Sequence, residues 1–218
     1  VKTLTPTQFG DLKTIFEFEL YGTGVDAGQT TFRLRHAYGE LHHFGAGQTW
    51  SPFMDPDVFP NSLEYWGPNG MVFFRTLQAR YMPVNNDKLR LIFAVENPGA
   101  SADQGAYTNF LELQNIKPKF DMPDISLQAR VMRGWGHLQI AGIFRKITWI
   151  DATPNPVIHL GDTVLGWGVN VSSNINFTKK DVGRFQVVYG EGIQNYMNDA
   201  PVDIATKANP GNPLRPIL

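Results

Sequence analysis

Hydrophobic and polar side chains alternate with a period of two between residues 11 and 20. One face of this expected strand carries Leu12, Phe16 and Phe18, whereas the other carries Lys13 and Glu17. Successive side chains of a strand point to opposite faces, so the pattern predicts one apolar face and one largely charged face. Similar segments of about ten residues recur between turn residues, which is typical of the strands of a transmembrane β-barrel.

The periodicity predicts about ten spanning strands. After a short strand remnant and a turn over residues 5–10, we expect strands over residues 11–20, 30–38, 44–50, 71–81, 88–97, 125–133, 137–149, 162–177 and 183–196. Short turns alternate with long breaks along the chain, as the two rims of an up-and-down barrel require. This alternation needs residues 107–120 to form a loop, and Pro118 and Pro123 favour that interpretation.

Composition limits the possible classes of protein. The 218 residues suffice for one large β domain, and the net charge of −1 argues against a nucleic-acid partner. Cysteine is absent, which excludes disulfides and thiolate metal sites. The chain has no long apolar run, so we expect no transmembrane helix. We expect residues 1–218 to be part of a single β-barrel domain, an internal piece of a longer protein with both ends missing.

Two long runs of sequence resemble the DcaP-like family of outer-membrane porins. The first covers residues 28–75 and includes GQTWSPFMDPDVFPN, and the second covers residues 186–201 and reads QVVYGEGIQNYMNDAP. The resemblance extends over nearly the whole chain. It implies a sixteen-stranded barrel in the bacterial outer membrane, a homotrimer in contact with lipid, which needs no cofactor and takes up small anionic solutes such as dicarboxylates.

The apolar faces of the strands are expected to contact lipid. Seven positions carry this prediction: Phe16, Phe18, Leu34, Leu91, Phe93, Leu127 and Ile140. In the strand over residues 30–38, the alternation also places His36 and Tyr38 on this face. Aromatic residues at strand ends are typical of the two membrane interfaces. Six residues fit that pattern: Tyr21, Tyr38, Trp50, Tyr81, Trp135 and Trp149.

The polar faces carry more basic than acidic residues and are expected to line the pore. The residues concerned are Lys13, Arg33, Arg35, Arg80, Arg90, Arg130 and Arg145, together with Glu17 and Glu19. Arginines in a confined pore attract carboxylates and bind them bidentately, so the pattern favours an anion path. The alternatives are ordinary solvated positions on a sheet, or pairing of Arg33 and Arg35 with the two glutamates to brace the wall.

Residues 51–70 form a long break with four prolines, and breaks of this length are usually functional. Its position matches the constriction loop of the family that the chain resembles. We expect the loop to fold into the lumen and to narrow the pore. The residues expected to act there are Asp55, Asp57, Glu64, Tyr65 and Trp66. The alternative is an external loop with surface acids.

Enzymatic activity has weak support in the sequence. Glu17 and Glu19 share one face of a strand about 7 Å apart, and a soluble carbohydrate-binding or glycoside-hydrolase domain could use such a pair. No second pair or sugar-binding motif accompanies them. His42 and His43 are adjacent and therefore point to opposite faces, so we expect neither a metal site nor a catalytic site. The leading hypothesis is a passive diffusion channel.

Overall fold

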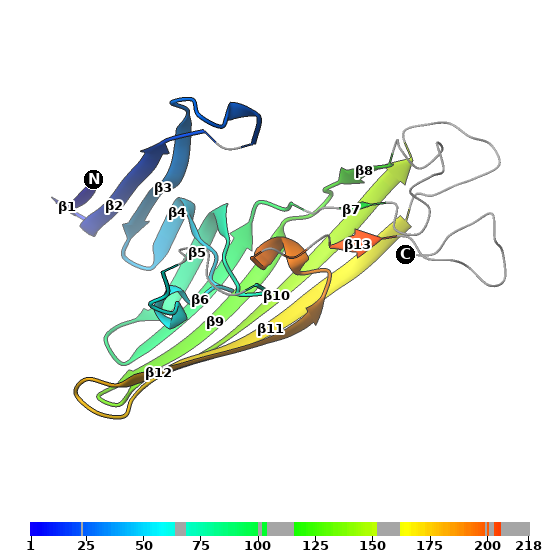
Figure 1. Cartoon of the computed structure of the whole chain (residues 1–218). Helices are drawn as coiled ribbons and strands as arrows, with labels where there is room; N and C mark the ends of the chain where they lie inside the picture. Colours follow the sequence, from blue (N-terminus) through cyan, green and yellow to red (C-terminus); the bar gives the residue numbers. More distant parts are fainter. Residues whose placement is uncertain are drawn as a thin grey trace.

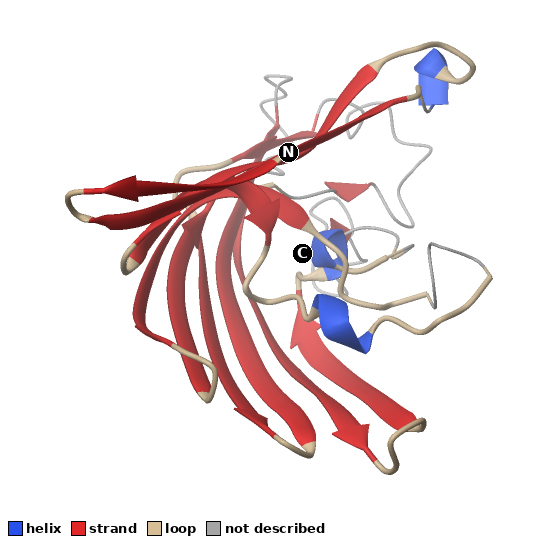
Figure 2. Cartoon of the chain, turned by 90° about the vertical axis from the view of Figure 1, so that its left-hand side faces the viewer, coloured by secondary structure: helices blue, strands red, loops and turns tan. Residues whose placement is uncertain are grey.

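The computed structural model describes residues 1–22, 24–63, 69–99, 102–103, 116–151, 162–198, 200 and 203–205. Eleven strands form one sheet that curves into an open trough (Figures 1 and 2). These strands are β1 (Lys2–Thr7), β2 (Gly10–Leu20), β3 (Phe32–Leu41), β4 (Phe44–Trp50), β5 (Arg75–Asn85), β6 (Leu89–Glu96), β8 (Ile116–Lys119), β9 (Asp124–Arg133), β10 (Gly136–Asp151), β11 (Asp162–Asn176) and β12 (Val182–Glu191). A separate two-stranded sheet pairs β7 (Ala102–Asp103) with β13 (Ile204–Ala205).

Sequential antiparallel pairing builds the large sheet in the order β1-β2-β3-β4-β5-β6-β9-β10-β11-β12. The prediction of an all-β antiparallel fold with about ten strands is therefore confirmed. Within the described residues, β1 and β12 are the two edges, and they do not pair with each other. The short helices within the described residues are η1 (Gly24–Asp26), η2 (Pro56–Val58) and η5 (Gln194–Tyr196). No helix in the described part of the chain is long and apolar enough to cross a membrane.

The two faces of the sheet differ in chemistry. Phe93 of β6 pairs with Leu127 of β9, and their side chains are 51% and 47% exposed. One residue further along, Ala94 pairs with Ser126, and both are buried. Ser126 in turn pairs with Ile143, which lies in the core inside the trough. The outer face is therefore apolar and exposed. Of the seven residues predicted there, Phe16, Phe18, Phe93, Leu127 and Ile140 are exposed, and Leu34 and Leu91 are partly exposed.

A β-bulge reverses the face of β3 and makes one prediction wrong. Leu34 pairs with Phe18, but His36 pairs with Glu17, so Arg35 is the extra residue in β3. A bulge of one residue exchanges the two faces beyond it. His36 and Tyr38 therefore do not share a face with Leu34, and the buried His36 ring contacts Thr49 Oγ1 through Nδ1 at 3.0 Å.

Two further segments differ from the predicted boundaries because proline is tolerated on a strand edge. Residues 116–119, predicted as loop, form β8, in which Pro118 pairs with Trp149 of β10. Pro6, predicted in a turn, lies in the edge strand β1. The predicted strand over residues 71–81 begins only at Arg75, and the strand predicted to end at Tyr196 ends at Glu191. The rest of the predicted loop over residues 107–120 lies largely outside the described residues.

The prediction of aromatic residues at the membrane interfaces is wrong for half of its members. Tyr21, Tyr81 and Trp135 are 45–46% exposed, in agreement with it. Trp149 is 1% exposed because it lies on the buried face of β10, where it pairs with Asp162 of β11. Trp50 is partly buried against the inner core, and Tyr38 lies beneath the Arg80 guanidinium. The position of a residue at a strand end does not show which face its side chain is on. The register of the strand sets that face, and therefore the exposure of the side chain.

Candidate pore surface

Residues 51–63 and 69–74, which follow β4 and precede β5, lie on the inner face of the trough; we call these residues the inward loop (Figure 2). Phe53 and Met54 are buried at 0% and 2% exposure. They belong to an apolar core that also contains Ile143 of β10 and Tyr196. The loop therefore packs on the wall of the trough through a hydrophobic contact. Glu64, Tyr65 and Trp66 lie outside the described residues.

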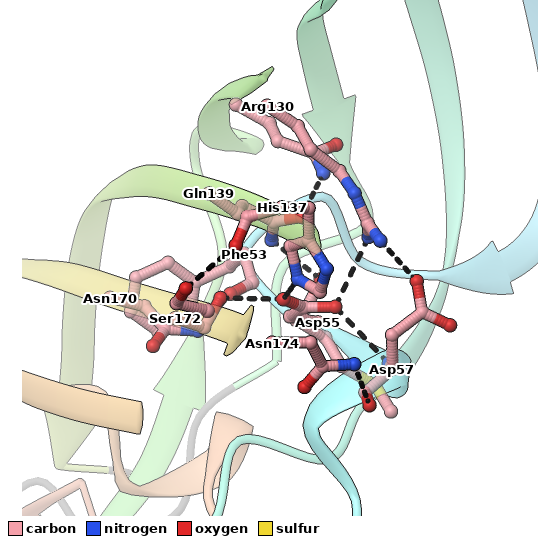
Figure 3. A network of polar contacts seen from close by, with 12 residues as sticks. Phe53, Asp55, Asp57, Arg130, His137, Gln139, Asn170, Ser172 and Asn174 are labelled. Carbon is pink, nitrogen blue, oxygen red and sulfur yellow. Dashed lines mark hydrogen bonds and ion pairs between the residues drawn. The ribbon is translucent and has the colours of Figure 1, made fainter. Parts of the chain in front are cut away.

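Asp55 is the polar centre of the contact between the inward loop and the wall (Figure 3). Its side chain is fully buried. Oδ2 lies 2.7 Å from His137 Nε2 and accepts a hydrogen bond of 2.7 Å from Ser172 Oγ. Oδ1 accepts hydrogen bonds of 3.2 Å from Arg130 Nη1 and 3.1 Å from the Asp57 backbone N–H. Three strands, β9, β10 and β11, thus hold one carboxylate of the loop.

The environment of Asp55 stabilises its charged form. Burial opposes ionisation, but hydrogen bonds from His137 and Ser172, followed by the charge of Arg130, outweigh it and lower the pKa of the Asp55 carboxyl. Asp55 also accepts the Asp57 N–H as the N-cap of η2, with Pro56 at the first helical position. The sequence Asp-Pro-Asp therefore specifies both the local turn and the attachment of the loop.

Amide side chains of the wall bind the backbone of the inward loop. Gln139 Nε2 donates to the Met54 carbonyl at 3.1 Å, and Asn170 Nδ2 donates to the Phe53 carbonyl at 2.7 Å. Asn174 Nδ2 donates to the Asp57 carbonyl at 2.8 Å. One inward side chain of β10 and two of β11 thus satisfy carbonyl groups that the loop would otherwise bury unpaired.

Two of the predicted pore-lining arginines are engaged in buried ion pairs. Arg130 contacts Asp57 as well as Asp55. Arg145 is 1% exposed and pairs with Asp124 at 2.9 Å and Asp203 at 2.8 Å. Each guanidinium thus has two carboxylate partners from the protein. These two arginines hold the inner segments of the trough in place.

Glu19 receives both arginines of β3. Arg33 Nη1 lies 3.7 Å from Glu19 Oε2, and Arg35 Nη2 contacts Oε1. Arg33 also lies 5.1 Å above the Tyr21 ring. Pairing with β2, one of the alternatives considered for these residues, is therefore the arrangement that the structure shows for Glu19. Glu17, by contrast, lies opposite His36 in the strand register.

The remaining predicted cations converge at the other end of the wall. Lys13, Arg80 and Arg90 line one cleft of about 270 Å³, which also includes Glu40 and Asp87. Arg80 Nε donates to Gln78 at 2.7 Å, and Arg90 Nε donates to Asn85 at 3.1 Å. We call this region the cationic cleft. It lies near the short turn that joins β5 to β6.

Several residues of the inner surface were not selected from the sequence. The alternation places His137 and Ser172 on the polar faces of predicted strands, so it predicts that their side chains point inward. It does not predict that both contact the Asp55 carboxylate. Asp203 follows the last expected strand, and no pattern linked it to Arg145, 58 residues earlier. Arg184 lies on the same face, opposite Asn174, and lines a second cleft of about 320 Å³ beside the loop.

Among the described residues, no cluster of His, Asp or Glu could hold a metal ion.

The sequence matches the family described as "DcaP outer membrane protein" over residues 1–198. The chain belongs to this family. It is a protein of the bacterial outer membrane, which confirms the predicted location and argues against a soluble carbohydrate-active domain. The fold is similar to the crystal structure of the outer membrane channel DcaP of Acinetobacter baumannii, with a TM-score of 0.75 and 18% sequence identity. The match covers 91% of this chain and 52% of that channel, so the chain spans about half the length of the solved protein. No protein with a curated description matches the sequence.

Proposed function

We propose that this DcaP family member forms a passive diffusion channel that prefers anions and admits small dicarboxylates. Three observations support the proposal: the family, the open trough with an apolar outer face, and the cationic cleft on its inner face. We further propose that three copies assemble in contact with lipid, as the resemblance implies. A heat-modifiable oligomer extracted only by detergent would agree with that assembly, whereas a detergent-free monomer would not.

The cationic cleft is the observation that carries the proposed anion preference. Arg130 and Arg145 each have two carboxylate partners in the protein, so their charge is neutralised within the wall, whereas Arg33 and Arg35 share the single carboxylate of Glu19. The cleft instead brings three cations together with two acids. A surplus of positive charge attracts anions, and contacts with several cations let a carboxylate pass without being trapped.

The inward loop supplies the proposed narrowing of the pore. It fills part of the inner face, and its attachment through Asp55 and the apolar core keeps it there. The exposed Asp57 contributes negative charge beside the path. We propose that the acids of the loop face cations elsewhere on the wall. This arrangement would create a transverse field that orients dipolar solutes.

The anion preference is tested by removing charge from the cationic cleft. Lys13→Ala combined with Arg90→Ala should reduce the anion preference, measured as the reversal potential across a salt gradient in planar bilayers. It should also slow dicarboxylate entry in liposome-swelling assays. Lys180→Ala is the matched control, because this exposed lysine lies in a turn away from the cleft. An unchanged reversal potential in the folded double variant would refute the assignment of the cleft.

A further inference from the structure

A second segment besides the inward loop enters the trough. After β12 the chain turns at Gly192, whose φ of 65° favours glycine, and continues through η5 to Asn198. We call residues 192–198 the return segment. Figure 1 shows it in front of the inner faces of β10 and β11. Ile193 and Tyr196 are 2% and 0% exposed, so this segment is packed on the wall.

The return segment pairs with the inward loop through its backbone. Val72 and Met197 form an antiparallel bridge. On either side of it, the Phe73 N–H donates to the Tyr196 carbonyl at 2.9 Å, and the Asn198 N–H donates to the Met71 carbonyl at 2.7 Å. The Gly70 N–H donates to the Asn198 carbonyl at 2.8 Å. The two segments are thus joined as a short ladder inside the trough.

The wall beneath the ladder is shaped to receive both segments. A Cβ atom on Gly168 of β11 would lie 2.9 Å from Ile193 Cδ1 and 3.1 Å from Phe53 Cζ. Glycine therefore lets a side chain from each segment pack directly on the backbone of β11. Tyr196 completes the contact, with its ring centroid 4.7 Å from that of Phe74.

Arg145 fixes the return segment to the wall. Its Nη1 donates to the Gly192 carbonyl at 2.6 Å and to Asp203 Oδ1 at 2.8 Å. Asp203 Oδ1 also accepts the Asn195 N–H at 3.0 Å. Asp124, the other partner of Arg145, accepts a hydrogen bond of 2.9 Å from the Tyr196 hydroxyl. Arg145 and its two carboxylates therefore hold both ends of η5.

We propose that the constriction has two parts, in which the return segment, clamped by Arg145 and Asp203, narrows the pore together with the inward loop. This inference rests on the proposed channel function. It assigns Arg145 and Asp203 as positioning residues that set pore size through the return segment. Without the clamp, residues 192–198 leave the inner face and the pore widens, although the inward loop keeps its own attachment at Asp55.

A cross-link tests the ladder. Val72 and Met197 exchange no backbone hydrogen bond with each other. The Cα atoms of such antiparallel pairs are about 4.5 Å apart, which is within the range of disulfides. The chain contains no cysteine, so Val72→Cys combined with Met197→Cys gives a single possible disulfide in it. Oxidation should close this bond in the folded protein. Val72→Cys with Gln194→Cys is the control, and its thiols should stay free.

Single-channel conductance tests the clamp. Asp203→Asn should raise the conductance and increase current fluctuations, and Tyr196→Phe should do so to a smaller extent because it removes only the bond to Asp124. Adding Val72→Cys and Met197→Cys to Asp203→Asn should return the conductance toward the wild-type value on oxidation and raise it again on reduction. This comparison uses one folded protein in two redox states, so it does not depend on equal folding of different variants.

The outcomes separate this inference from the channel proposal. If the wild-type protein forms no channel in bilayers, the proposed function fails. If it conducts, but folded Asp203→Asn conducts identically and oxidation has no effect, the return segment does not set the pore size. Failure of the Val72→Cys and Met197→Cys pair to form a disulfide in a conducting protein would refute the ladder itself.

Discussion

Replacing Asp55 by asparagine should detach the inward loop while leaving the sheet intact. Asp55 is fully buried and accepts hydrogen bonds from Arg130 and Ser172 and contacts His137. Hydrogen bonds to charged groups contribute roughly 1.5–3 kcal/mol each. Asparagine keeps one acceptor oxygen but removes the charge, and its amide N–H groups face other donors. Arg130 retains Asp57, so its charge is not left unpaired.

The expected loss is about 2–3 kcal/mol in the free energy that holds the loop on the wall, somewhat below the usual cost of breaking a buried ion pair. A loss of this size raises the open population of the loop on the order of 100-fold. Hydrogen–deuterium exchange of peptides covering residues 51–63 measures it directly. Exchange in β11 should be unchanged and serves as an internal reference.

Asp57→Asn is the matched control for Asp55→Asn. Both acids lie on the same loop and contact Arg130, but the Asp57 side chain is 54% exposed. Exposed ion pairs contribute about 0–1 kcal/mol, so the control should change exchange little. Wild-type exchange in Asp55→Asn, or a larger effect from Asp57→Asn, would refute the assignment of Asp55 as the anchor.

Three further predictions concern pH, the outer face and the packing of the inner segments. Because the pKa of Asp55 is lowered from 3.8, its stabilisation is complete above that value and is lost only as the pH falls through the lowered pKa. The difference in hydrogen–deuterium exchange over residues 51–63 between the wild type and Asp55→Asn should therefore be the same at pH 7 and pH 5, and a difference that shrinks between these pH values would contradict the assignment. Phe93→Arg should destabilise the membrane-inserted barrel by about 2–4 kcal/mol if the residue lies near the bilayer midplane, measured by urea unfolding in lipid vesicles with Phe93→Leu as control. Gly168→Ala should cost about 1–3 kcal/mol through overpacking, whereas Gly142→Ala should be tolerated in the same unfolding assay, because its added Cβ would meet no atom closer than 3.8 Å.

The faces of the regular strands could be predicted because side-chain alternation alone determines them. Phe93, Leu127 and Ile140 lie on the exposed face as their period of two requires. In β3 the same rule failed beyond Arg35, since a single extra residue exchanges the faces and leaves no strong mark in composition. The sequence therefore predicts the fold class well. It predicts the direction of a side chain only up to the first bulge in its strand.

The partners of the inner charges could not be predicted, because they depend on contacts between distant segments. The basic residues on the polar faces were identified, but Arg130 and Arg145 take carboxylate partners from the inward loop, the start of β9 and the chain after β12. Those partners lie 21 to 75 residues away in sequence. Alternation gives the face of a residue, whereas only the packed loops decide whether its charge stays available to a solute.

The ion selectivity of the wild-type protein decides whether the pore conducts anions in preference to cations. The measurement is the reversal potential of single channels in a planar bilayer with a potassium chloride gradient, repeated after a dicarboxylate salt is added to one side. We expect a reversal potential of the sign set by chloride and a dicarboxylate current carried through the same channels. A cation-selective reversal potential, or channels that exclude the dicarboxylate, would contradict it.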